Sequence, residues 1–390
     1  MRQHVSIAGV GYTAVGEHWE RSLADLALEA IQAALADARL GPGDVDALVV
    51  GNALASLFSS QAHLGPIIAA HAGLHGIEAL RIEGADAAGG LALRSGAALI
   101  SSGTAQTVVV VGVEKTTDCL GPERVSALAT LLDAEYEAVH GITPTAVAGL
   151  LMRRYMHAYG LEMDDFEGFS INAHQNGSQN PKAMFRNQIK PGRFAAAPMV
   201  ADPVNLFDVA PEADGAAAVV LTANEQIIQQ IPMPIRVVGS AAATDSLALH
   251  QREDMLFLRA VNLAAGRAFE QAGITPGQVD ILEAHDAYTV LTALQLEAAG
   301  FAEKGQGWRL AAENRISRDG DLPVSTFGGL KARGNPLGAT GVYQVAEITL
   351  QLRGEADDLQ VPGEPQLGMA LNLGGLGSTA TTHLLERVDR

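Results

Sequence analysis

The order of apolar and polar positions predicts a chain that alternates strands with helices. Purely apolar runs such as 108–111 and 216–221 are typical of buried strands, and longer Ala-rich stretches with a helical repeat are typical of packed helices. We expect strands at 4–10, 47–51, 107–113, 216–222, 235–239, 281–284, 367–373 and 381–385. We expect helices at 21–38, 86–102, 258–272, 288–299 and 337–353. This pattern indicates an α/β protein.

One segment occurs twice. Residues 29–53 and 263–287 each read as an Ala-rich helix, a Pro-Gly turn and a Val-Asp-x-Leu strand, with Pro42 aligned to Pro276. A single repeat over this distance indicates two related halves rather than a solenoid. We place the halves at 1–230 and 231–390, with the break near 226–234. The stretch 115–212 is rich in turns and short helices, and we expect it to be a cap inserted into the first half.

Composition narrows the classes of function. The 390 residues are 48% hydrophobic and 5% aromatic, as in soluble α/β proteins, and no apolar run is long enough for a bilayer. The net charge of −18 argues against nucleic acid, while a few local basic groups would suffice for coenzyme A. No signal-peptide pattern is present, so we expect a cytoplasmic protein. Cys119 is the single cysteine, and the His71/His75 spacing is interrupted by Gly73, so we expect no disulfide and no metal.

A series of motifs runs in order along nearly the whole chain. The most specific is the block 328–341, which contains Gly-Asn-Pro-Leu-Gly-Ala-Thr-Gly. The others lie at 83–90, 113–118, 153–157, 174–181, 214–218, 283–288 and 372–377. Together they resemble the thiolase superfamily, in particular its archaeal and sterol-carrier-protein-like branch. The resemblance implies the thiolase fold, with two duplicated halves in a five-layer αβαβα core.

The resemblance also shows which reactive groups differ. In such thiolases one cysteine carries the acyl group, the histidine of a Gly-His-Pro block activates it, and a second cysteine acts as acid and base. Asp86 stands at the place of the first cysteine and Asn335 at the place of that histidine. The second cysteine would lie at Ala287 or within 372–377, and neither place has a thiol. We therefore expect a thiolase scaffold that lacks these three groups but retains His285.

Each candidate residue has two interpretations. Asp86 is either the N-cap of the helix that follows it or a catalytic base. His285 is either a satisfied core residue or, as the resemblance implies, a donor to the thioester oxygen. Asn335 is either a turn residue before Pro336 or an amide donor to an oxyanion. Tyr288 and Tyr343 are either core aromatics or acid/base hydroxyls. The resemblance further implies that Gly374, Gly375, Gly377 and Ser325 contact coenzyme A.

Three functions follow from these alternatives. The first is an enzyme that makes or breaks a C–C bond in a CoA thioester without a covalent acyl intermediate, as in retro-aldol cleavage. The second is a catalytically silent subunit that binds acyl-CoA, and the third is a residual Claisen acetyl-CoA acetyltransferase. The resemblance implies a homodimer or tetramer formed through a strand edge beside 107–113, and a small zinc-ribbon/OB-fold partner protein. We expect no nucleic acid or membrane partner.

Overall fold

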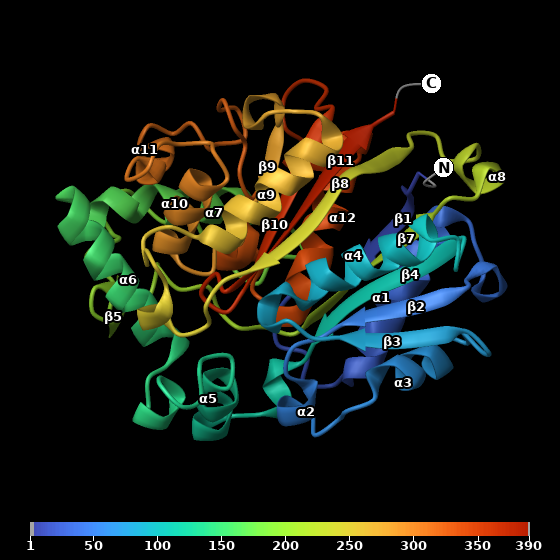
Figure 1. Cartoon of the computed structure of the whole chain (residues 1–390), viewed down its shortest axis with the longest axis horizontal. Coiled ribbons are helices and arrows are strands. Elements are labelled where there is room, and N and C mark those ends of the chain that lie inside the picture. The colour runs from blue at the N-terminus through green and yellow to red at the C-terminus, as the bar shows by residue number, and fades with distance from the viewer. Residues whose placement is uncertain (1–3, 389–390) are drawn as a thin grey trace.

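The computed structural model describes residues 4–388, and within that range nine strands form one mixed sheet. The sheet has the order β3-β2-β4-β7-β1-β8-β11-β10-β9 (Figure 1). The first half supplies β1 (Ser6–Tyr12), β2 (Ala47–Gly51), β3 (Glu78–Ile82), β4 (Thr107–Glu114) and β7 (Gly215–Thr222). The second half supplies β8 (Ile235–Thr244), β9 (Ile281–Glu283), β10 (Leu367–Gly374) and β11 (Thr379–Arg387). A separate small sheet consists of β5 (Met199–Ala201) and β6 (Val204–Asn205).

The two halves repeat one topology about the centre of the sheet. In the first half, β1 pairs with antiparallel β7, and the parallel strands β4, β2 and β3 follow outward. In the second half, β8 pairs with antiparallel β11, and the parallel strands β10 and β9 follow outward. The halves are joined where β1 pairs with β8, at Ser6 with Arg236 and Ile7 with Ile235. This arrangement agrees with the duplication seen in the sequence.

Helices complete five layers. α4 (Ala88–Ser101) and α12 (Thr340–Arg353) each pack against strands of both halves, so they form the central layer (Figure 1). α1 (Leu23–Ala38) and α3 (Leu64–His71) pack on the first half, and α9 (Arg259–Ala272) packs on β8 and β11 of the second half, with α10 (Thr289–Ala298) beside it. Every predicted strand and helix is present, with the largest change in β8, which continues to Thr244.

The cap between β4 and β7 is more regular than expected. It contains α5 (Gly121–Ala129), α6 (Pro144–Tyr159) and α7 (Glu167–Gly177). α6 has 16 residues, begins with the side chain of Thr143 as its N-cap and ends at Gly160 in the left-handed conformation, so the expectation of only short helices was wrong. The remaining short helices are α2 (Ala55–Phe58), α8 (Glu225–Ile228) and α11 (Gly307–Ala312).

The edges of the sheet differ from the prediction. The strand at 107–113 is β4, which lies inside the sheet between β2 and β7, so it offers no edge of its own. The outer strands are β3 and β9, and a bridge from Leu282 to Val324 covers the free side of β9. Across residues 4–388 no helix combines the length and apolar character needed to cross a bilayer. In the same range no three acidic, histidine or cysteine side chains gather as a metal ion would require.

Candidate active site

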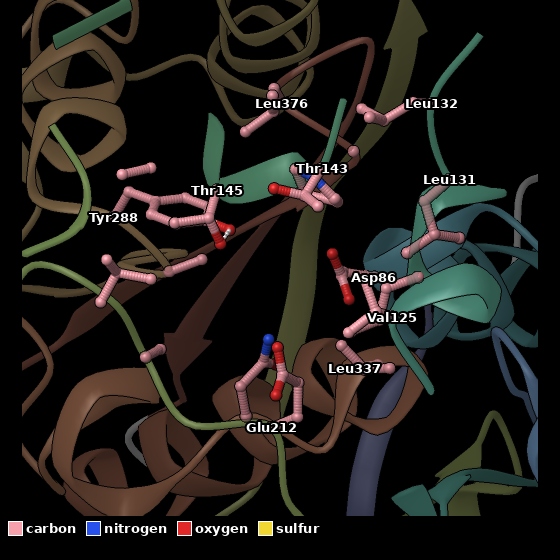
Figure 2. Close-up of a pocket in the computed structure, with 18 of the residues that line it drawn as sticks. Asp86, Val125, Leu131, Leu132, Thr143, Thr145, Glu212, Tyr288, Leu337 and Leu376 are labelled. Atoms are coloured by element: carbon pink, nitrogen blue, oxygen red, sulfur yellow. Dashed lines mark hydrogen bonds between the residues drawn. The ribbon is translucent and has the colours of Figure 1, made fainter. Parts of the chain in front are cut away.

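A cavity of about 290 Å³ lies where the cap meets the core of both halves (Figure 2). Its wall is apolar on one side, where the side chains are Val125, Leu128, Leu131, Leu132, Leu337 and Leu376. Its polar lining consists of Asp86, Arg124, Thr143, Thr145, Glu212, Tyr288 and Asn335. A small cavity with an apolar wall and a few convergent polar groups is the usual form of a ligand site.

The two central helices bring distant motifs together at this cavity. An added Cβ at Gly89 of α4 would lie 2.8 Å from the carbonyl oxygen of Gly338, and one at Gly341 of α12 would lie 2.4 Å from the nitrogen of Gly90. These glycines therefore allow the first turns of α4 and α12 to touch through their backbones. Asp86 precedes α4 and Asn335 precedes α12, which explains why both line one cavity.

Asp86 is a buried carboxyl group without a hydrogen-bond partner. α4 begins at Ala88 with Ala87 as its N-cap, and no backbone N–H in residues 4–388 donates to Asp86, so the N-cap interpretation is wrong. The Oδ1 atom is buried and unpartnered. Burial, together with the negative charges of Glu114, Glu212 and Glu83, raises the pKa of Asp86 to about 8. The group is therefore mostly protonated at neutral pH and still able to release its proton.

His285 is a neutral ring whose tautomer is set by its neighbours. It follows β9, and Gln295 hydrogen-bonds both its backbone N–H (3.0 Å) and its carbonyl oxygen (2.6 Å). The Gly90 N–H donates to Oδ1 of Asn372, which leaves Nδ2 of Asn372 to donate to Nδ1 of His285 at 3.2 Å. The proton of the ring is then on Nε2, which is buried and unpartnered. His285 is fully buried and is not among the residues that line the cavity. Burial and the nearby Arg333 lower the pKa of His285 to about 3.

Asn335 lines the cavity with its amide. Its Oδ1 accepts a hydrogen bond from the hydroxyl of Thr340 at 2.8 Å, which leaves the NH₂ group as the available donor. Its backbone is paired with the segment before β7, because Asn335 N–H donates to Pro211 and Ala213 N–H donates to Asn335. An amide fixed in this way can donate to an oxyanion but cannot act as a base.

The two candidate tyrosines lie in different places. The hydroxyl of Tyr288 is in the cavity, 3.1 Å from Oγ1 of Thr145 (Figure 2). Tyr343 is fully buried in the core, where its hydroxyl is 3.0 Å from Oγ1 of Thr13 and the guanidinium of Arg333 lies over its ring. Tyr343 does not line the cavity, so the structure supports its interpretation as a core aromatic.

Of the four residues expected to contact coenzyme A, Gly375 alone lines the cavity. Gly374 is held close to the carbonyl oxygen of Gly84, which a Cβ at residue 374 would approach to 2.3 Å. Gly377 packs near Leu258, and the carbonyl of buried Ser325 accepts a hydrogen bond from Asn176. These three residues shape the turns around the site rather than its surface.

Several cavity residues carry no recognisable motif in the sequence. Glu212 and Arg124 bring opposite charges, and Thr143 and Thr145 bring hydroxyl groups. Burial raises the pKa of Glu212, whereas Arg124 favours its ionised form. Cys119 is buried in an apolar cluster with Leu337 and does not line the cavity, so it is not placed as a nucleophile.

Comparison with known proteins agrees with the fold. Residues 5–199 match the family model "Thiolase, N-terminal domain", and residues 241–387 match "Thiolase C-terminal domain-like". Acetyl-CoA acetyltransferase of Methanothermobacter thermautotrophicus is 43% identical over 98% of this chain and 99% of its own. Acetyl-CoA acetyltransferase of Methanocaldococcus jannaschii is 37% identical, over 98% of each chain.

Solved structures show the same architecture at lower identity. The Ltp2-ChsH2(DUF35) aldolase has a TM-score of 0.86 at 23% identity, with 99% of this chain and 98% of that chain covered. Human mitochondrial 3-ketoacyl-CoA thiolase in complex with CoA has a TM-score of 0.74 at 18% identity, over 99% and 98% of the two chains. The chain has the thiolase fold, and it belongs to the thiolase superfamily.

Proposed function

We propose that this protein binds an acyl-CoA and makes or breaks a C–C bond beside the thioester without forming an acyl-enzyme. The observation that carries the proposal is the state of Asp86. Its carboxyl group lines the cavity without a partner, at the position where the resemblance places an acyl-carrying cysteine. The relatives named acetyl-CoA acetyltransferase support CoA-thioester chemistry, and the aldolase of similar fold is an example of C–C bond chemistry on this fold. A carboxylate is a weak nucleophile and would form a labile anhydride, so proton transfer suits Asp86 better.

Retro-aldol cleavage of a β-hydroxyacyl-CoA is the reaction that fits these polar groups. A base removes the β-hydroxyl proton, the Cα–Cβ bond breaks, and its electron pair passes to the thioester enolate. The amide of Asn335, which lines the cavity, would stabilise the enolate oxygen. We propose the unpartnered Nε2–H of His285, behind the cavity lining, as the second donor. Protonated Asp86 then delivers its proton to Cα, giving a shorter acyl-CoA and a carbonyl compound. In the reverse direction, ionised Asp86 takes the Cα proton. A pKa of about 8 allows both directions near neutral pH.

Coenzyme A is a substrate in this proposal rather than a bound cofactor. Gly375 is the glycine that we propose to contact it, because this residue lines the cavity. The cytoplasmic location and the homodimer or tetramer expected from the sequence stay predictions.

The first test is a cleavage assay with a panel of 3-hydroxyacyl-CoA thioesters, read by chromatography of the CoA products. We expect cleavage by the natural chain and a loss of at least about 100-fold in Asp86→Asn, which keeps the size of the side chain but cannot carry the proton. Intact-mass measurement with acyl-CoA should show no covalent adduct. A stable adduct on Asp86 or Cys119 would instead favour Claisen acyl transfer, which is the activity that the names of the archaeal relatives suggest.

A silent acyl-CoA-binding subunit is the second candidate. The aldolase of similar fold, whose name joins Ltp2 with the DUF35 protein ChsH2, is the observation that suggests a subunit working with a partner. We propose a small zinc-ribbon/OB-fold protein as a partner, so the assay is run with and without such a protein. Measurable CoA binding with no turnover in either condition would support the silent subunit. In that case Asp86→Cys combined with Asn335→His should introduce some thiolase activity if the cavity accepts CoA.

A further inference from the structure

Two carboxyl groups face each other across the cavity. Asp86 and Glu212 come from separate segments, one before α4 and one at the end of the cap, and Figure 2 shows their oxygen atoms directed into the same space. The retro-aldol reaction described above gives Asp86 the Cα proton but leaves the base at the β-hydroxyl without a residue. A second titratable group in the same cavity is therefore a candidate for that step.

The backbone holds Glu212 in a fixed place beside Asn335. Asn335 N–H donates to the carbonyl of Pro211 at 2.9 Å, and Ala213 N–H donates to the carbonyl of Asn335 at 3.0 Å. These two bonds lie on either side of residue 212 and form a short parallel bridge. Glu212 is thus held against the segment that carries Asn335, a proposed enolate donor. A catalytic group needs a fixed position of this kind.

The charged neighbours of the two carboxyl groups favour different protonation states. Both pKa values are raised by burial, but Arg124 favours ionised Glu212, whereas Glu114 and Glu212 itself disfavour ionised Asp86. Arg124 therefore favours the carboxylate form of Glu212, whereas the neighbouring carboxylates favour the protonated form of Asp86. Two carboxyl groups with separated roles of this kind form an acid–base pair.

The other hydroxyl-bearing groups in the cavity do not fit the role of base. Burial raises the pKa of Tyr288, whose hydroxyl is hydrogen-bonded with Thr145, so the phenolate is not available near neutral pH. Thr143 and Thr145 carry alcohols that do not ionise in this range. Among the cavity residues, Glu212 is the carboxylate that remains for the β-oxygen.

We propose that Glu212 is a second catalytic carboxylate, which accepts the β-hydroxyl proton while Asp86 donates a proton to Cα. This inference rests on the proposed function. In cleavage, Glu212 becomes protonated as the carbonyl forms, the C–C bond electrons pass to the enolate, and Asp86 becomes ionised as Cα is protonated. The pair is reset when Glu212 releases a proton to solvent and Asp86 takes one up. In the synthetic direction, protonated Glu212 supplies the proton to the new alkoxide.

The test separates the two proton transfers. Exchange of the Cα protons of acetyl-CoA in D₂O, followed by mass spectrometry, needs Asp86 and the enolate donors but no base at a β-oxygen. Cleavage of a 3-hydroxyacyl-CoA needs both carboxyl groups. We expect Glu212→Gln to lower cleavage by at least about 100-fold and to keep exchange within about threefold of the natural chain, while Asp86→Asn loses both. Glu212→Asp, which retains the carboxyl group, should recover part of the cleavage.

Glu83→Gln is the matched control. Glu83 also raises the pKa of Asp86, but its side chain is outside the cavity and accepts the Ala85 N–H, which a glutamine oxygen can also do. If Glu212 acts only through the charge on Asp86, Glu83→Gln should affect cleavage similarly. An equal loss of exchange and cleavage in Glu212→Gln, or no loss of cleavage, would overturn the inference while leaving the proposed function intact. If the natural chain catalyses neither exchange nor cleavage, that result would overturn the proposed function itself.

Discussion

At the scale of single residues, Asp86 links function to stability. The pKa of Asp86 is about 8 in the folded chain and near the ordinary aspartate value of 3.8 when unfolded, so the folded protein holds a proton that the unfolded chain releases. The contribution of Asp86 to stability is therefore present below pH 4 and is lost as the pH rises toward 8. Buried titratable groups with strongly shifted pKa values are typical of functional sites.

Asp86→Asn removes this titration. We expect the free energy of unfolding of the variant, relative to that of the natural chain, to rise by about 3–4 kcal/mol between pH 5 and pH 8. Urea unfolding at both pH values measures the two free energies. Because the other titrating groups are common to both proteins, their effects cancel in the difference. A difference that does not change with pH would contradict the raised pKa.

Asn372 sets the tautomer of His285 through two hydrogen bonds, one from Gly90 N–H and one to Nδ1. Asn372→Ala removes the donor to Nδ1 and should lower activity by about 10–100-fold, as for other residues that orient a catalytic group. Nitrogen NMR of histidine-labelled protein measures the effect directly, with His285→Gln used for assignment. In the natural chain the spectrum should show a protonated Nε2 and an unprotonated Nδ1. An unchanged tautomer in Asn372→Ala would show that other contacts set it.

Sequence motifs located part of this site but not all of it. The resemblance to thiolases placed Asp86 and Asn335 in one site, and both line the cavity. Glu212 could not, because its place depends on backbone pairing with Asn335, far away in the chain. Tyr343 was a poor candidate because neither its spacing nor its neighbours in sequence show that its hydroxyl faces Thr13.

At the scale of elements, the contact between α4 and α12 positions the site. Gly341→Ala would place a methyl group 2.4 Å from both Gly90 N and Oδ1 of Asn372, atoms that cannot easily move. We expect a loss of about 2–4 kcal/mol in the free energy of unfolding, together with weaker CoA binding. Gly266→Ala on α9 is the control, since its Cβ meets nothing within 4 Å and alanine should add up to about 1 kcal/mol in a helix.

Periodicity predicted the inner strands and most of the long helices, and it missed α3, the edge strand β3 and the helices of the cap. β2 was predicted with its observed bounds because all of its residues are buried. β3 was missed because its residues are exposed or half-buried, so it lacks the apolar run of an inner strand. α6 was missed although its buried residues Val147, Ala148, Leu151, Met152 and Tyr155 recur at helical spacing. The division of the chain at residue 230 stays a prediction, although β8 begins shortly after it.

At the scale of the whole molecule, β3 is the open edge of the sheet. It pairs with β2 on one side, and no described strand lies on its other side, whereas β9 is covered by the bridge to Val324. Leu80 in β3 is 36% exposed. Open edges associate unless they are protected, and pairing of two copies about a twofold axis would cover this one. The dimer that we predict should therefore form along β3 rather than through β4.

Leu80→Lys tests this arrangement, because two copies of the new charge would face each other across the twofold axis at the edge strands. We expect the dimer to weaken by at least about tenfold, measured as the dissociation constant by sedimentation equilibrium. Leu150→Lys is the control on the cap, where Leu150 is 58% exposed and far from β3 in the chain. A dimer that survives Leu80→Lys but dissociates in Leu150→Lys would place the interface on the cap. Since the cap supplies Val125, Leu128, Leu131 and Leu132 of the apolar wall, that result would also make CoA binding depend on protein concentration.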